Sequence, residues 1–246
     1  MLIFFSCTDN VKYEIMIYEK MVSHRNKGLA YLEEENFDEA ENQFESLTLL
    51  NPVEPLGFAN LGLTYLRSDG DLDKSEKWLK KALKLNDKHP DIRMLLTLYY
   101  ELNNKDSLAF DFLKETINFS PNHIKTLHKL FIYNSKKNDA KSKKNAKDYL
   151  TRIIEIIPGN IIAQLNLIKI LLKDNNSTDG LQRLKRISQI FPKLPKNAEQ
   201  ILNEALRFLN IKDISQAETY IMIFENLIRP TSFYKSSIIE LKGNIG

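Results

Sequence analysis

The sequence predicts an all-α protein, and three observations support this fold class. The 246 residues include only 8 Gly and 8 Pro, too few for the many tight turns of a β-sandwich or barrel. Apolar residues recur every three or four positions, as in Leu79, Ala82 and Leu83, which is the period of an amphipathic helix. The same order of small, aromatic and apolar residues also returns along the chain. Short helical units that repeat are expected to stack into a solenoid.

Composition limits the classes of function. Hydrophobic residues make up 43% and charged residues 27% of the chain, which is ordinary for a folded protein. The formal net charge of +3 is too small to indicate nucleic acid or an anionic membrane as partner. The sequence lacks an apolar run of 18 residues or more, so we expect no membrane-spanning helix. The single cysteine, Cys7, cannot form a disulfide within the chain or a thiolate metal cluster.

Three segments show the repeat most clearly. In each, a small residue is followed three positions later by Tyr, then by a small residue after a turn and by a bulkier apolar residue four positions further on. The three sets are Gly28, Tyr31, Ala40 and Phe44; Gly62, Tyr65, Ser75 and Leu79; and Thr97, Tyr100, Ala109 and Leu113. Pro52 and Pro121 end the first and third segments. This order and a spacing of about 34 residues resemble the tetratricopeptide repeat (TPR) family.

The resemblance implies a right-handed α-solenoid of about six helix–turn–helix repeats with a C-terminal capping helix. In that family the small residues allow helix A of a repeat to lie close to helix B. We predict an N-terminal segment at 1–20, an array at 21–231 and a cap or tail at 232–246. The repeats of the array are expected at 21–54, 55–89, 90–123, 124–160, 161–194 and 198–231. The last three copies match the pattern less well, and the fourth is longer, in a lysine-rich turn.

The resemblance also implies a concave groove built mainly by the A helices. Counting the family's groove positions along the chain gives a set of candidate residues for binding a peptide. They are Arg25, Leu29, Leu63, Arg67, Met94, Leu98, Lys125, His128, Ile132, Lys169 and Lys173. The first three repeats offer an apolar half, and repeats four and five offer a lysine-bearing half. We therefore predict a protein or peptide partner with apolar anchors and acidic flanks. The alternative is that several of these leucines pack inside the array.

Some TPR proteins hold a chaperone's terminal carboxylate with Lys and Asn at two set positions of one repeat. Those positions carry Arg25 and Leu29 in repeat one, and Met94 and Leu98 in repeat three. The corresponding pair in repeat two is Ala59 and Leu63. The sequence therefore does not predict a receptor for chaperone tails.

The motifs of common enzymes are missing from the sequence. It has no glycine-rich phosphate loop and no nucleophile elbow. The four histidines, His24, His89, His123 and His128, do not stand at metal-ligand spacing with Cys, Asp or Glu. We predict that the protein is not an enzyme and has neither a cofactor nor a metal.

A lysine-rich stretch lies at residues 136–147, where six of twelve residues are Lys. Lysines can contact phosphates as point charges. The stretch contains no Arg and no aromatic residue on which a base could stack. We interpret it as a solvated turn between helices and predict no nucleic-acid partner.

The first residues allow two interpretations. Met1–Phe5 are apolar and precede Ser6 and Cys7, which resembles the end of a bacterial lipoprotein signal with a lipidated cysteine. A signal peptide also has a basic start and about 7–15 apolar residues, and both are lacking here. The other interpretation is an apolar N-terminus that packs on the first helix. The lipoprotein interpretation would place the protein in the bacterial cell envelope, facing the periplasm, which we favour over the cytoplasm.

These observations predict a non-enzymatic scaffold for protein–protein interactions, with two alternatives. The first alternative is the recognition arm of a larger envelope protein. Residues 213–243 resemble the end of TPR modules that precede FG-GAP and ASPIC/UnbV-type domains in bacterial envelope proteins. The second is an outer-membrane assembly factor that is anchored by a lipid on Cys7.

Overall fold

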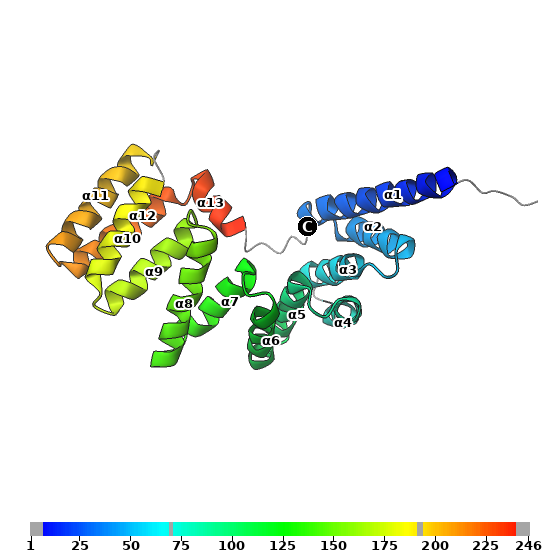
Figure 1. Ribbon diagram of the computed structural model, residues 1–246, viewed down its shortest axis with the longest axis horizontal. Helices are drawn as coiled ribbons and strands as arrows, with labels where there is room; N and C mark the ends of the chain where they lie inside the picture. Colours follow the sequence, from blue (N-terminus) through cyan, green and yellow to red (C-terminus); the bar gives the residue numbers. More distant parts are fainter. Residues whose placement is uncertain (1–6, 69–70, 191–193, 240–246) are drawn as a thin grey trace, which may run out of the picture. The chain divides into compact units, whose positions relative to one another are not determined.

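The computed structural model describes residues 7–68, 71–190 and 194–239, and within these ranges every regular element is an α-helix. The helices form two compact units, the first up to Ser120 and the second from Pro121 onward. In each unit, helices that follow one another in the chain pack side by side (Figure 1). This arrangement confirms the predicted all-α solenoid fold.

The first unit consists of three helix pairs, and each pair packs on the next. Its helices are α1 (Cys7–Glu33), α2 (Phe37–Leu50), α3 (Pro55–Arg67), α4 (Leu72–Leu85), α5 (Pro90–Leu102) and α6 (Asp106–Phe119). Helix α1 is 27 residues long, about twice the length of its partner α2. It begins well before Met21, where the sequence analysis placed the start of the array.

The second unit also contains three helix pairs, followed by a short helix. Its helices are α7 (Ile124–Ser135), α8 (Ala140–Ile156), α9 (Ile161–Lys173), α10 (Ser177–Ile190), α11 (Lys196–Asn210), α12 (Ile214–Ile228) and α13 (Ser232–Ile239). The described residues thus contain the six helix pairs and the C-terminal helix that the fold prediction requires. Helix α13 contacts α9 of the fifth pair.

Local sequence explains where many helices begin. The side chains of Asn36, Asp71, Asp139, Asn160 and Asp213 each accept a hydrogen bond from the backbone N–H three residues further on. Such caps satisfy donors that the first turn of a helix leaves unpaired. Helices α3 and α5 begin at a proline, whose fixed φ suits the first helical position. In α3 the side chain of Glu54 also accepts from the backbone N–H of Gly57 at 2.8 Å.

Four turns within the helix pairs share one backbone feature. Glu35, Asn104, Asn175 and Lys212 have φ values of 57°, 55°, 57° and 59°. Each is the second residue after the A helix of its pair, where the chain reverses direction. A left-handed residue is a common way to end a helix, and outside glycine it is best tolerated by Asn. The repeated geometry shows that the same turn is built from different residues.

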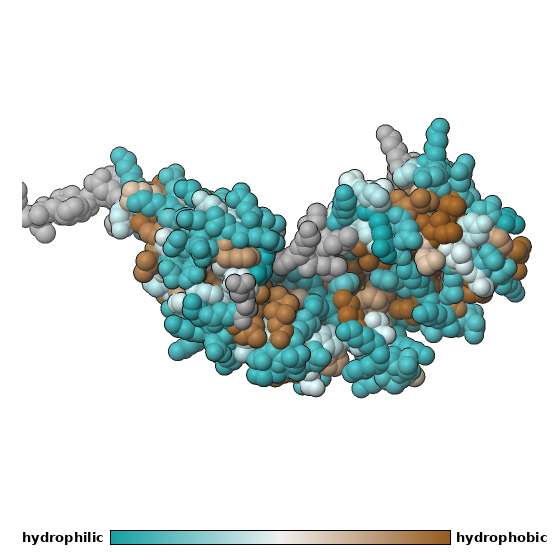
Figure 2. Space-filling model, turned by 180° about the vertical axis from the view of Figure 1, so that it is seen from behind, coloured by the Kyte–Doolittle hydropathy of each residue, from teal (hydrophilic) through white to brown (hydrophobic). Residues whose placement is uncertain are grey.

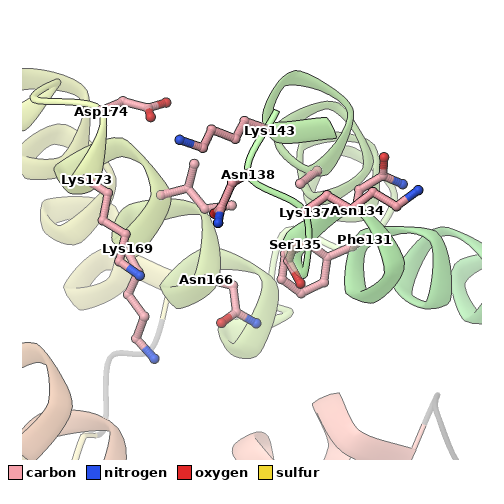
Figure 3. Close-up of a pocket in the computed structure, with 12 residues that line it drawn as sticks. Phe131, Asn134, Ser135, Lys137, Asn138, Lys143, Asn166, Lys169, Lys173 and Asp174 are labelled. Carbon is pink, nitrogen blue, oxygen red and sulfur yellow. The ribbon is translucent and has the colours of Figure 1, made fainter. Parts of the chain in front are cut away.

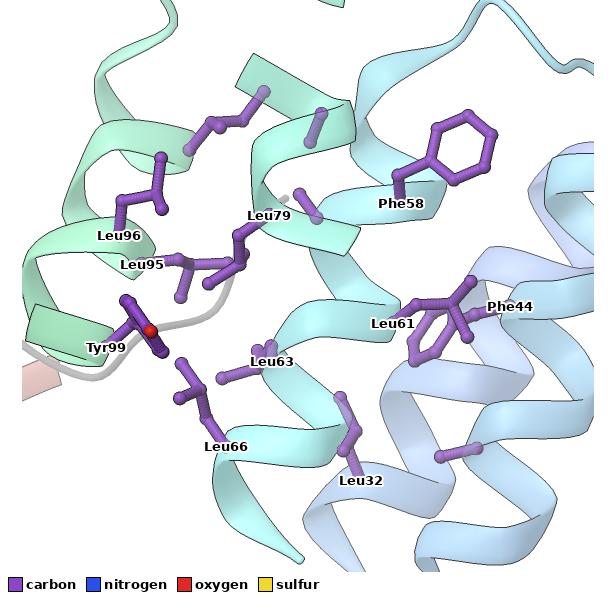
Figure 4. Packing of buried hydrophobic residues seen from close by; sticks show 14 of the residues in the cluster. Leu32, Phe44, Phe58, Leu61, Leu63, Leu66, Leu79, Leu95, Leu96 and Tyr99 are labelled. Carbon is purple, nitrogen blue, oxygen red and sulfur yellow. The ribbon is translucent and has the colours of Figure 1, made fainter. Parts of the chain in front are cut away.

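Small residues set the distance between the helices of a pair. A Cβ atom added to Gly28 would lie 2.6 Å from Cε1 of Phe44, and one added to Gly62 would lie 2.5 Å from Cγ of Leu79. Phe44 and Leu79 are both fully buried. Figure 4 shows these two side chains within the core of the first unit. The glycines therefore make the close contact between helices A and B that the sequence predicted.

Helix α3 lies at the centre of the first unit. The ten consecutive residues Gly57–Leu66 are all buried, because α2, α4 and α5 contact this helix from different sides. Asn60 is 0% exposed, and neither atom of its side-chain amide has a hydrogen-bond partner among the described residues. Burial on all sides leaves α3 little surface for a partner.

A buried arginine joins α5 to α6. Arg93 is only 6% exposed, and its guanidinium lies 3.9 Å from the ring centre of Phe112. Its Nε donates to Oγ1 of Thr116 at 2.9 Å, and NH2 donates to Oε2 of Glu115 at 2.6 Å. NH1 donates to the backbone oxygen of Asp87 at 3.2 Å. The charge is thus compensated by hydrogen bonds from several groups.

We expect Gly28→Ala and Gly62→Ala to lower the free energy of unfolding by roughly 1–3 kcal/mol each, because the new methyl group overpacks the helix contact. The higher helix propensity of Ala, about 1 kcal/mol, offsets only part of this loss. Urea unfolding followed by circular dichroism and by the fluorescence of Trp78 would measure the effect. Gly159→Ala is the control, because its Cβ meets no atom within 4 Å. Unchanged midpoints for both helical variants would contradict the packing argument.

Arg93→Met should destabilise the first unit by about 2–3 kcal/mol, because it removes hydrogen bonds to charged and polar groups in a shielded position. Thermal unfolding monitored by the fluorescence of Trp78 would show a lower transition temperature. Lys114→Met is the matched control, since Lys114 forms an exposed ion pair with Asp111 at 2.7 Å within the partner helix α6. Such a pair contributes little. Equal losses in the two variants would show that Arg93 has no special role.

Candidate functional site

In the first unit, a hollow lies between α1 and the start of α3. Its volume is about 170 Å³, and its lining residues are Tyr18, Met21, Val22, Arg25, Leu47, Glu54 and Leu56. Most of the lining is apolar. Nε of Arg25 is shielded from solvent and has no hydrogen-bond partner among the described residues. A shielded donor without an acceptor is unfavourable, and the lining also contains one carboxylate, that of Glu54.

The other candidates of the first unit have different surroundings. Leu29, Met94 and Leu98 are partly buried and keep some surface. Arg67 is exposed, and its NH1 lies 3.9 Å from Oε1 of Glu33. Leu63 is only 4% exposed and belongs to the hydrophobic core. The prediction that Leu63 is a groove residue is wrong, because α3 is covered by neighbouring helices on several sides.

The hollow also includes a residue that the sequence analysis did not consider. Tyr18 lies on the part of α1 that precedes Met21. The signal was present in the sequence, since Val11, Ile15 and Tyr18 follow the spacing of one helix face. All three side chains are exposed. Treating residues 1–20 as a segment outside the array concealed this helical extension.

In the second unit, a larger hollow of about 340 Å³ lies between α7, α8 and α9 (Figure 3). It is lined by Phe131, Asn134, Ser135, Lys137, Asn138, Lys143, Ala146, Asn166, Lys169, Ile170, Lys173 and Asp174. Two of these, Lys169 and Lys173, are among the predicted groove residues. Lys137 and Lys143 come from the lysine-rich stretch that we interpreted as a solvated turn. Only residues 136–139 of that stretch form a turn, because α8 begins at Ala140.

The chain's own C-terminal helix covers another part of α9. Nζ of Lys169 lies 2.5 Å from Oε2 of Glu225 on α12. The hydroxyl of Tyr234 on α13 donates to Oε1 of the same carboxylate at 3.1 Å, and burial raises the pKa of Tyr234. Leu165 on α9 is only 1% exposed. The predicted groove residue Lys169 therefore contacts the chain itself, and Leu165, one helical turn before it, is buried.

The candidate groove residues on α7 are less exposed than a groove position would require. Lys125, His128 and Ile132 are all partly buried. The His128 ring centre is 5.9 Å from that of Phe131. Burial, with a smaller contribution from the charge of Lys129, lowers the pKa of His128 to about 4. His128 is thus neutral at pH 7 and contributes no charge to a partner.

The part of the chain that the structure describes contains neither a metal-binding cluster nor a membrane-spanning helix. No group of three or more His, Cys, Asp or Glu side chains is placed to hold a metal ion there. No helix in that part combines the length and apolar character needed to cross a membrane. Cys7 begins α1, but its side chain lies outside the described residues. Lipidation of Cys7 therefore stays a prediction.

The fold and the two hollows define a class, the helical repeat proteins that present surfaces between stacked helix pairs. Comparison with protein families identifies the repeat. The model described as "Tetratricopeptide repeat" matches residues 25–54 and 57–89. The resemblance stated from the sequence is confirmed, and the two matched segments are tetratricopeptide repeats. The weaker resemblance to modules ahead of FG-GAP domains receives no support from these comparisons.

Similar proteins include one curated relative and several solved structures. Human protein O-mannosyl-transferase TMTC3 is 26% identical over 167 residues, which is 68% of this chain and 18% of that protein. The chain thus spans about a fifth of the relative's length. The structure of PilF from Pseudomonas aeruginosa has a TM-score of 0.62 at 16% identity, covering 91% of this chain and 99% of that one. PilW, described as a widely conserved type IV pilus biogenesis factor, has a TM-score of 0.56 at 13% identity, with coverages of 89% and 98%. At these identities the two structures show a shared fold.

The state of His128 leads to a prediction about pH. Because its pKa is about 4 in the folded chain and 6.5 ordinarily, the unfolded chain takes up this proton at a higher pH. The stabilisation by the neutral ring is complete above about pH 6.5 and is lost as the pH falls toward 4. The loss between pH 7 and pH 5 is at most about 2 kcal/mol.

An NMR titration of the histidine ring signals would test this, with His128→Gln to assign the resonance. We expect the His128 signal to titrate near pH 4, and the variant to lose less stability than the wild type between pH 7 and pH 5. A midpoint close to 6.5 would show that the ring is solvated.

Proposed function

We propose that the protein is a non-catalytic scaffold that binds a segment of another protein on the inner faces of its helix pairs. The main support for this proposal is the position of Arg25 beside the hollow of the first unit. This predicted groove residue borders a hollow with Met21, Val22 and Leu56, and its shielded Nε has no hydrogen-bond partner among the described residues. A peptide could place an apolar side chain in the hollow and offer a backbone or carboxylate oxygen to the guanidinium.

The chemistry of the partner follows from the surfaces that stay accessible. Leu29, Met94 and Leu98 retain exposed area on the A helices of the first unit. Apolar patches also interrupt the hydrophilic surface of each unit on the face that Figure 2 shows. Lysines line the hollow of the second unit. These features support a partner with apolar anchors for the first unit and acidic groups for the second.

Peptide selection would test the scaffold. We expect a phage library of random peptides, about twelve residues long, to yield binders with apolar anchors when selected on the full chain. Arg25→Glu combined with Leu29→Glu should weaken the selected peptides at least tenfold, since it reverses the charge of Arg25 in the hollow and places a second carboxylate one helical turn away at Leu29. The control is Lys27→Glu, an exposed change on the same helix.

Two results would contradict the proposal. One is a library that yields no binder. The other is a set of binders that is equally affected by the groove variant and by Lys27→Glu. Circular dichroism of each variant would establish that the helical fold is intact.

The two alternatives keep the binding role and change its setting. A recognition arm of a larger protein agrees with the match to TMTC3, in which the similar part is 18% of the relative. An assembly factor with a lipid on Cys7 agrees with the fold shared with PilW, whose described role is in pilus biogenesis. The mass of the native N-terminal peptide would separate them, because a lipidated Cys7 at the mature N-terminus is required by the second alternative only.

A further inference from the structure

The hollow of the second unit is built by lysines that are far apart in the sequence. Lys143 is the fourth residue of α8, whereas Lys169 and Lys173 lie on α9 one turn apart. Figure 3 shows Lys143 reaching across from the α8 side toward α9. A smaller set of lysines continues around the start of α8, where a neighbouring hollow of about 420 Å³ is lined by Lys143, Lys144 and Lys147 together with Ala140, Asp148 and Asp174.

Positive charge prevails among the lining residues. The hollow between α7, α8 and α9 has four lysines and one acidic residue, Asp174. Asp174 is already paired, because its Oδ2 lies 3.3 Å from Nζ of Lys147. Lys169 is paired with Glu225. Among the described residues, Lys143 and Lys173 have no ion-pair partner. Two exposed ammonium groups therefore border the hollow without an internal carboxylate.

The rest of the lining is suited to a short polar chain. Asn166 is partly buried, and its amide forms no hydrogen bond with another described residue. Asn134, by contrast, donates to the backbone oxygen of Leu130 at 2.7 Å and serves the structure of α7. Phe131 and Ile170 supply an apolar floor. A volume of about 340 Å³ is near the lower limit for ligand pockets, which fits one or two side chains better than a large ligand.

We propose that this hollow is a binding site for adjacent carboxylates of an acidic peptide segment, held by Lys143 and Lys173. The inference rests on the proposed scaffold function and names the chemistry that its second unit recognises. The contact between Lys169 and Glu225 is an internal example of a lysine of α9 that pairs with a carboxylate.

Acidic peptide fits the site better than nucleic acid. The only aromatic residue of the lining, Phe131, is 9% exposed, so it offers no face on which a base could stack. The lining cations are all lysines, and the planar fork of arginine that grips phosphate from two sides is missing from it. Flexible lysines around an apolar floor accommodate carboxylates on a short aliphatic stem.

The test measures the binding of labelled hexaglutamate to the full chain by fluorescence anisotropy at about 50 mM salt, where surface charge is weakly screened. Hexaglutamine is the neutral probe, and a hexanucleotide of thymidine is the nucleic-acid probe. The site variant is Lys143→Gln with Lys173→Gln. The matched control is Lys141→Gln with Lys185→Gln, which removes the same charge at exposed positions of the same unit outside both hollows.

We expect hexaglutamate to bind the wild type and to bind the site variant roughly five- to tenfold more weakly, with little change in the control. The site proposal is overturned if hexaglutamate does not bind, if both variants weaken it equally, or if the hexanucleotide binds as tightly. Failure of this site proposal alone would leave the scaffold proposal standing, because the peptides selected on the full chain would still respond to Arg25→Glu with Leu29→Glu.

Discussion

Close contact between the two helices of a pair is the constraint on which the rest of the structure depends. Gly28 against Phe44 and Gly62 against Leu79 leave no room for a side chain, so in the first two pairs the A helix lies directly on its B helix. A pair formed in this way still has an apolar face that it cannot bury by itself. The next pair covers that face, which is why the helices stack in chain order.

Helices in the middle of a unit are buried on more sides than the helices at its ends. Helix α3 has neighbours on several sides and buries ten consecutive residues, including the unsatisfied amide of Asn60. At the start of the chain α1 extends beyond its partner, and Val11, Ile15 and Tyr18 remain exposed. At the other end, α13 returns to α9 and buries Tyr234. The same repeat therefore produces a core helix, an open helix face and a covered groove, depending on its neighbours.

These differences decide which surfaces are left for a partner. In the first unit, Arg25 keeps a shielded donor beside an apolar hollow. In the second, α12 and α13 take up part of the inner face through Glu225 and Tyr234. The accessible remainder is the lysine-lined hollow between α7, α8 and α9. Recognition by this protein would then depend on two small sites of different chemistry, one apolar with an arginine and one cationic.

The sequence by itself determined the helical class, the family resemblance and the close contacts at Gly28 and Gly62. These features were readable because helical periodicity and small-to-large pairing within one repeat depend on residues close together in the chain. It could not place Leu63, Lys143 or Tyr234. Leu63 is buried by helices on several sides of α3, and Lys143 borders a hollow completed by α9. Tyr234 lies on α13, which packs on α9 of the fifth helix pair. Tertiary structure decided these positions, since burial and charge at a site are set by contacts between residues distant in the sequence.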